Sequence, residues 1–254
     1  MDLSSMLKEF RNEVVADFLP GAVAIYFVSI ATGHAPMVIV RDALAGAPEL
    51  QTSAVALVLA FSIIAWLVGS SLSQISHFPE AVSSWLNYSN FSVIQQFAQK
   101  YEAKQAGASR LAQFIVRDPF VADIESNSYT PETFLWRPIY RRRHRSHPYV
   151  DATYKMHDWL GAHRPELAAR AIRILTEGIM LRKIALVSYV AIPLHIATWW
   201  VGATSFNWLF IGVSAAAAIA ATLAVGQKFS AFQWLVVQQY YAIRSAEPAR
   251  TTTP

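Results

Sequence analysis

Residues 208–226 read WLFIGVSAAAAIAATLAVG, a stretch that contains no Asp, Glu, Lys or Arg. At 1.5 Å per residue, a helix of this length covers about 28 Å, close to the ~30 Å hydrocarbon thickness of a bilayer. Amphipathic helices of soluble proteins carry charged residues on one face, and this stretch carries none. It therefore predicts a transmembrane helix.

Three further stretches have the same apolar character, and the chain as a whole is 54% hydrophobic and only 15% charged. They cover residues 18–40, 54–74 and 184–203. Together the four stretches predict an all-α polytopic membrane protein with two transmembrane helices before a long polar segment and two after it.

The predicted organisation has three parts. Residues 1–75 hold an amphipathic surface helix over 3–17, a kink at Pro20-Gly21 and the first two spans. Residues 76–183 form a mainly helical domain, and residues 184–254 hold the last two spans and a C-terminal helix. Helical patterns over 165–180 and 227–244 are expected to continue into the third and fourth spans.

The distribution of basic residues predicts the orientation. Of 21 Lys and Arg, 15 lie in residues 76–183, whereas the loop 41–52 has only Arg41. Basic loops stay on the cytoplasmic side of a membrane. We therefore expect both termini and the domain 76–183 to be cytoplasmic, in a multi-pass protein of the bacterial inner membrane.

The most distinctive segment is WRPIYRRRHRSHPY, residues 136–149. Arginine binds phosphate with two parallel hydrogen bonds, and aromatic rings stack on bases, so the segment predicts a site for a nucleotide or single-stranded nucleic acid. The predicted ligand residues are Trp136, Arg137, Tyr140, Arg141, Arg142, Arg143, His144, Arg145, His147 and Tyr149.

Two other roles for this segment stay open, namely contact with anionic lipid headgroups and pairing within the chain. The excess of arginine over lysine favours a site with defined geometry. A metal site is disfavoured, although His144, His147, His157 and His163 invite it, because arginines surround His144. No metal and no cofactor is expected.

Catalytic signatures are lacking in the sequence. There is no Gly-x-Ser-x-Gly motif and no phosphate-binding glycine loop, and no cysteine occurs. The acidic residues near Asp118 and the serines that follow them form no recognised nucleophile arrangement. The sequence therefore argues against an enzyme.

Polar residues within the apolar stretches are candidates for a pore or a gate. His195 lies near the middle of the third stretch, and an ionisable group at that depth is a functional candidate by default. A stripe of small residues, Gly212, Ala216, Ala220 and Ala224, is expected to pack against another helix. The predicted pore or gating residues are Ser62, Ser73, His195, Thr198, Thr222 and Gln227.

These features predict an oligomeric membrane effector, channel-like or membrane-disrupting, regulated by an anionic cytoplasmic ligand at the arginine-rich segment. The expected partners are membrane lipids, further copies of the chain, and a nucleotide or single-stranded nucleic acid. In architecture alone the layout is similar to membrane effectors of bacterial nucleotide-signalled antiviral systems, which implies a role in antiviral defence. The alternative is a membrane-anchored scaffold that docks a cytoplasmic protein partner through the aromatic segment 128–149.

Overall fold

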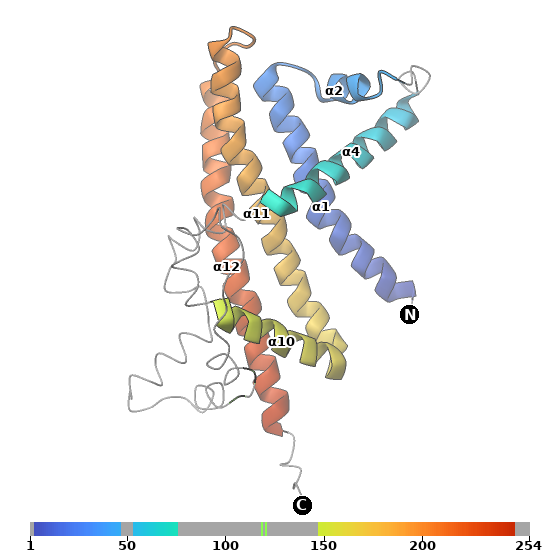
Figure 1. Cartoon of the computed structure of the whole chain (residues 1–254), viewed down its shortest axis with the longest axis vertical. Coiled ribbons are helices and arrows are strands. Elements are labelled where there is room, and N and C mark those ends of the chain that lie inside the picture. Colours follow the sequence, from blue (N-terminus) through green and yellow to red (C-terminus); the bar gives the residue numbers. More distant parts are fainter. Residues whose placement is uncertain (1–2, 47–52, 76–117, 119, 121–146, 247–254) are drawn as a thin grey trace, which may run out of the picture. The chain divides into compact units, whose positions relative to one another are not determined.

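The computed structural model describes residues 3–46, 53–75, 118, 120 and 147–246 of the chain. Within these residues there are six helices and no strand, which confirms the all-helical prediction (Figure 1). The helices are α1 (Leu3–Thr32), α2 (Pro36–Ala43), α4 (Ala54–Ile75), α10 (His147–His163), α11 (Pro165–Trp200) and α12 (Trp208–Ala246).

Three of these helices, α4, α11 and α12, are long and apolar enough to cross a membrane. At 1.5 Å per residue, α4 is about 33 Å long, while α11 and α12 reach about 54 and 58 Å. The last two exceed a ~30 Å hydrocarbon layer, so part of each must lie outside it. Their length confirms that the helical patterns over 165–180 and 227–244 continue the apolar stretches.

The first apolar stretch differs from the single span predicted over 18–40. Helix α1 runs without interruption from Leu3 through Pro20 to Thr32, so the residues expected to form a separate surface helix continue directly into the first apolar stretch. The interruption falls at residues 33–35, and α2 is bent by 100° relative to the last part of α1. Gly33 has a positive φ of 73°, and Pro36 begins α2, where a missing N–H costs nothing. A bent pair of helices therefore replaces one straight helix.

The chain divides into two compact units, each of which is described by itself. The first unit contains residues 1–83 and 176–225, and the second contains residues 84–175 and 226–254. Helices α11 and α12 are continuous across this division, so each contributes one segment to both units.

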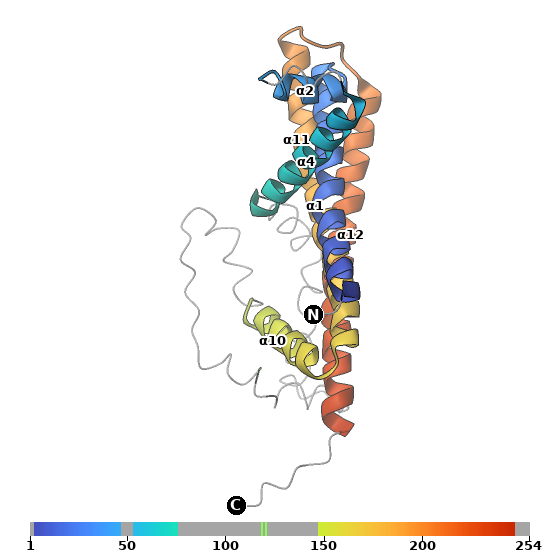
Figure 2. The ribbon, with the colours of Figure 1, turned by 90° about the vertical axis from the view of Figure 1, so that its right-hand side faces the viewer.

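In the first unit, the C-terminal part of α1 lies beside the ends of α11 and α12 that meet at the 201–207 turn, as both ribbon views show (Figures 1 and 2). Ala31, Ala191 and Phe210 form a small buried core, one residue from each helix. Phe27 packs edge-on against Phe210 with ring centroids 5.7 Å apart. We call this arrangement the three-helix bundle.

Helix α4 crosses α1 at two glycines. A Cβ atom placed on Gly69 would lie 1.7 Å from the carbonyl oxygen of Asp17, and one on Gly21 would lie 1.7 Å from that of Ala65. Only a residue without a side chain fits at either position. The contact is reciprocal, since each glycine comes four residues after the carbonyl that the other helix touches.

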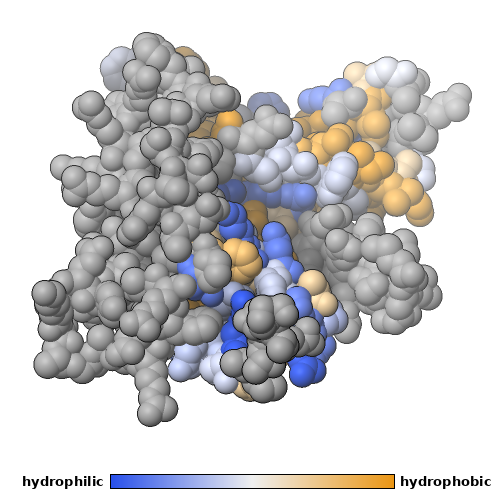
Figure 3. Space-filling view, turned by 60° about the horizontal axis from the view of Figure 1, so that its bottom comes forward, coloured by the Kyte–Doolittle hydropathy of each residue, from blue (hydrophilic) through white to orange (hydrophobic). Residues whose placement is uncertain are grey.

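Apart from this crossing, α4 is largely exposed, and only 11% of its most apolar segment is buried. Val55, Leu59 and Ile63 are among its exposed side chains. The space-filling view shows hydrophobic residues gathered at the upper right, the side on which α4 begins in Figure 1 (Figure 3). Such an apolar surface is typical of a membrane or protein contact.

The second unit has its own core. Met156 and Leu160 of α10 are fully buried, as are Phe232, Val236 and Val237 of α12. The rings of Tyr154 and Phe232 lie 5.7 Å apart and join the two helices. Burial of such side chains contributes about 1.5–3 kcal/mol each, which is enough to hold α10 on the second segment of α12.

Candidate functional site

The predicted arginine-rich ligand site falls on a part of the chain that is not described. Residues 136–146 lie outside the described residues, and the side chains of His147 and Tyr149 in the first turn of α10 do so as well. Ligand binding by this segment therefore stays a prediction.

Two of the histidines considered for a metal site are engaged in hydrogen bonds. Nε2 of His157 donates to the carbonyl of Ala168 at 3.2 Å, and Nδ1 of His163 donates to the carbonyl of Trp159 at 2.8 Å. The His163 ring also stacks on Trp159, with centroids 4.0 Å apart. His157 thus links α10 to α11, whereas His163 contacts only its own helix.

A polar and aromatic cluster in the second unit was not predicted from the sequence. The guanidinium of Arg244 lies 5.5 Å from the ring centre of Trp159, and Tyr240 meets the same ring edge-on. Asp118 is buried and accepts a hydrogen bond from the Phe120 amide at 2.9 Å. These residues come from three distant segments, and no sequence spacing indicates their contact.

Tyr240 lies beyond the predicted span 208–226, in the part of α12 that belongs to the second unit. Burial, followed by the charge of Asp118 and a hydrogen bond with it, raises the pKa of Tyr240 from 10.0 to about 12. Arg244 acts in the opposite direction. The hydroxyl is thus held in its neutral form.

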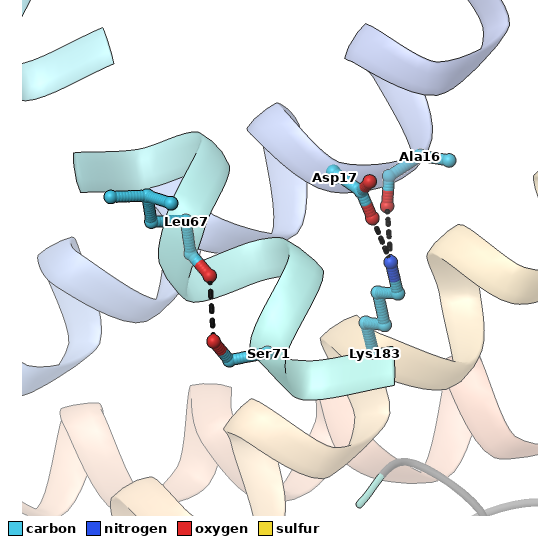
Figure 4. Close-up of polar contacts among 5 residues, drawn as sticks. All are labelled: Ala16, Asp17, Leu67, Ser71 and Lys183. Carbon is cyan, nitrogen blue, oxygen red and sulfur yellow. Dashed lines mark hydrogen bonds and ion pairs between the residues drawn. The ribbon is translucent and has the colours of Figure 1, made fainter. Parts of the chain in front are cut away.

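The first unit contains a buried ion pair between Lys183 of α11 and Asp17 of α1. Lys183 is only 1% exposed, and its Nζ also donates to the carbonyl of Ala16 at 3.1 Å. Figure 4 shows the lysine directed at both acceptors. A buried ammonium needs such partners, because burying it unpaired would cost several kcal/mol.

The bundle has a constant register between α1 and α11. Lys183 contacts Ala16, and Thr198 donates to the carbonyl of Ala31 at 2.5 Å. Both contacts join residues 167 positions apart in the sequence. The two helices therefore run parallel and in step between these contacts, a distance of about 22 Å at 1.5 Å per residue.

His195 is 1% exposed and lies five residues before the end of α11, closer to the helix end than predicted. Its Nε2 accepts a hydrogen bond from the backbone N–H of Asn207 at 3.0 Å. The Asn207 side chain in turn caps α12 by accepting from the amide of Phe210 at 3.0 Å. His195 thus holds the turn between the two long helices.

Thr198 and Thr222 also lie in the bundle. Thr198 donates toward the carbonyls of Ala31 and His195, and its oxygen accepts from Thr204 at 3.2 Å. Thr222 is buried and shares a hydrogen bond of 3.0 Å with the hydroxyl of Tyr189. The structure therefore brings together three predicted gating residues, His195, Thr198 and Thr222, in one bundle.

The other three predicted gating residues are placed elsewhere. Ser62 is on the surface of α4 and donates to its own helix, at the carbonyl of Val58, 2.8 Å away. Ser73 is half-buried near the end of α4, and Gln227 is exposed on α12. Among the described residues, the six predicted gating residues therefore do not lie together in one place.

Most of the small-residue stripe of α12 is exposed among the described residues, while Ala224 is half-buried, so its expected packing against another helix stays a prediction. Gly212, Ala216 and Ala220 are exposed, and no atom lies within 4 Å of a Cβ placed on Gly212. The buried face is a neighbouring one, which is formed by Phe210, Ser214, Ala218, Ala221 and Val225. The bulky Phe210 ring, in contact with α1 and α11, decides which face turns inward.

Comparison with known proteins finds no match for this chain, whether against family models, curated proteins or solved structures.

Proposed function

We propose that the chain is an oligomeric membrane effector, channel-like or membrane-disrupting, whose state is set by an anionic cytoplasmic ligand. The ligand is a nucleotide or a single-stranded oligonucleotide that binds the arginine-rich segment 136–149. The protein then sits in the bacterial inner membrane with its termini and residues 76–183 in the cytoplasm. Its layout is similar to that of membrane effectors of bacterial nucleotide-signalled antiviral systems, and we therefore propose a role in antiviral defence.

The observation that carries this proposal is a line of polar side chains on the packed side of α11. Lys183, Ser188 and His195 are buried and Thr198 is half-buried, and the line covers about 22 Å of a ~30 Å hydrocarbon layer. Polar and ionisable groups inside a membrane protein are costly, so they are usually retained for passage of an ion or a gating change.

Because α11 and α12 are continuous, they connect these polar side chains to the second compact unit. Each helix runs without a break from the second compact unit into the first. A helix transmits a displacement along its axis. Ligand binding in the domain 76–183 would therefore shift α11 and α12, and with them the buried polar side chains of α11.

The test is ion flux through liposomes that contain the purified protein. Nucleoside triphosphates, cyclic dinucleotides and short single-stranded oligonucleotides are added in turn, and we expect one class to change the flux. The triple variant Arg141→Ala, Arg142→Ala, Arg143→Ala should abolish both binding and the response. A matched control, Arg164→Ala, Arg170→Ala, Arg173→Ala, removes the same charge from exposed positions and should keep both.

A tight bilayer under every ligand would refute the effector proposal. Unchanged nucleotide binding in the first triple variant, together with loss of a co-purifying protein, would instead favour the scaffold.

A further inference from the structure

Several buried polar atoms of the three-helix bundle have no hydrogen-bond partner among the described residues. One is the hydroxyl oxygen of Ser29 on α1, and two others are Nδ1 of His195 on α11 and the hydroxyl oxygen of Ser214 on α12. The last two residues are almost fully buried, His195 at 1% exposure and Ser214 at 0%. Leaving such a group unsatisfied costs about 1–3 kcal/mol, so each atom requires a partner.

The protonation of His195 limits what that partner can be. Because Nε2 accepts the N–H of Asn207, this nitrogen carries a lone pair and no proton. The neutral ring therefore carries its proton on Nδ1, which must donate. A metal or alkali cation cannot bind there, and the partner must be a hydrogen-bond acceptor.

Ser214, like Ser29 on α1, differs from three other serines in the apolar helices. Ser62, Ser71 and Ser188 each donate to the carbonyl four residues earlier in their own helix, at 2.8, 2.8 and 2.9 Å. This back-bonding is the usual way to satisfy a serine in a transmembrane helix. Ser214 does not make it, so its hydroxyl remains available to a ligand in the bundle.

Phe210 relates the surroundings of the two residues. Its ring lies 5.1 Å from the His195 ring, edge to face. Ser214 follows Phe210 by four residues on the same buried face of α12, about one turn away. His195 and Ser214 therefore border the same part of the core.

We infer that Nδ1 of His195 and the hydroxyl of Ser214 bind a water molecule inside the bundle. The water oxygen accepts a hydrogen bond from Nδ1–H, and the water forms a second hydrogen bond with the serine hydroxyl. Buried waters typically have 2–4 such partners. This inference goes beyond the proposed function and does not require ion passage. It assigns His195 a bound ligand in addition to its role in the α11–α12 turn.

The experiment is magic-angle-spinning NMR on the full chain in liposomes, with ¹⁵N-labelled histidine. The His195 signal is assigned by its loss in His195→Gln. We expect the shift of a ring protonated at Nδ1, and polarisation transfer from water to that proton. Ser214→Ala should abolish the transfer, whereas Ser188→Ala, which removes a buried serine with its own backbone partner, should preserve it.

Absence of transfer in the wild-type protein, or a ring protonated at Nε2, would overturn the inference without any variant. Transfer that persists in Ser214→Ala would also overturn it, because the serine would then not share the water. The measurement uses a sealed bilayer at rest, so its outcome is separate from that of the flux assay.

Discussion

Replacement of Gly69 by alanine is expected to force α4 away from α1. The new Cβ would lie 1.7 Å from the Asp17 carbonyl oxygen, whereas ordinary contact begins at 3.4 Å. The two backbones would therefore have to separate by about 1.7 Å, the difference between these distances. Overpacking of this kind usually costs about 1–3 kcal/mol, and more where the clashing atom is backbone that no rotamer change can move.

The assay is thermal unfolding of the purified protein in detergent, followed by tryptophan fluorescence. Gly69→Ala should lower the melting temperature clearly. Gly212→Ala is the matched control, because it adds the same methyl group to an apolar helix where no atom lies within 4 Å. It should leave the melting temperature unchanged or raise it slightly, since alanine favours a helix over glycine by about 1 kcal/mol.

Gly21→Ala tests the reciprocal half of the crossing. It should destabilise the protein like Gly69→Ala, since its Cβ would meet the Ala65 carbonyl. The double variant should lose less than the sum of the single losses, because separation of the helices for one methyl makes room for the other. Equal melting temperatures for Gly69→Ala and Gly212→Ala would refute the reasoning.

Two further predictions concern charged and titratable groups. Lys183→Met should lower the melting temperature strongly, because loss of one partner from a buried ion pair costs about 3–5 kcal/mol. The cost is reduced here because the Asp17 side chain is 20% exposed. The double variant Lys183→Met, Asp17→Asn should regain part of the lost stability. A single variant as stable as the wild type would contradict this. Because the folded-state pKa of Tyr240 is raised from 10.0 to about 12, its contribution to stability should be complete below pH 10 and lost as the pH rises toward 12. Chemical denaturation at increasing pH measures this loss, and a Tyr240→Phe protein with the same alkaline dependence as the wild type would refute it.

The helices that could be predicted from the sequence are those in which one signal dominates. Residues 54–74 are mostly apolar and carry no charge, and α4 covers Ala54–Ile75. Helical periodicity beyond the third and fourth stretches predicted that α11 and α12 are longer than a membrane requires. The bend after Thr32 was underestimated, although Gly33 and Pro36 are visible in the sequence, because the angle between two helices depends on packing.

The contacts between helices could not be predicted, because they depend on register. The ion pair of Lys183 and Asp17 joins residues 166 positions apart, and nothing local in either segment indicates the partner. The stripe through Gly212 and Ala216 was expected to pack against another helix because its residues are small, and within the described part of the chain it is exposed. Small size does not indicate which helix is the partner, and the face of α12 that is buried in the single chain contains the bulky Phe210.

Asp17 connects three helices of the first unit. Its carboxylate pairs with Lys183 on α11, while its carbonyl oxygen is the atom that Gly69 of α4 approaches. The constant register from Lys183 to Thr198 means that α1 and α11 cannot slide past each other without breaking contacts at both ends. A shift of α11 along its axis must therefore carry α1 with it. Through the glycine crossing, which tolerates no added atom, the same shift must displace α4.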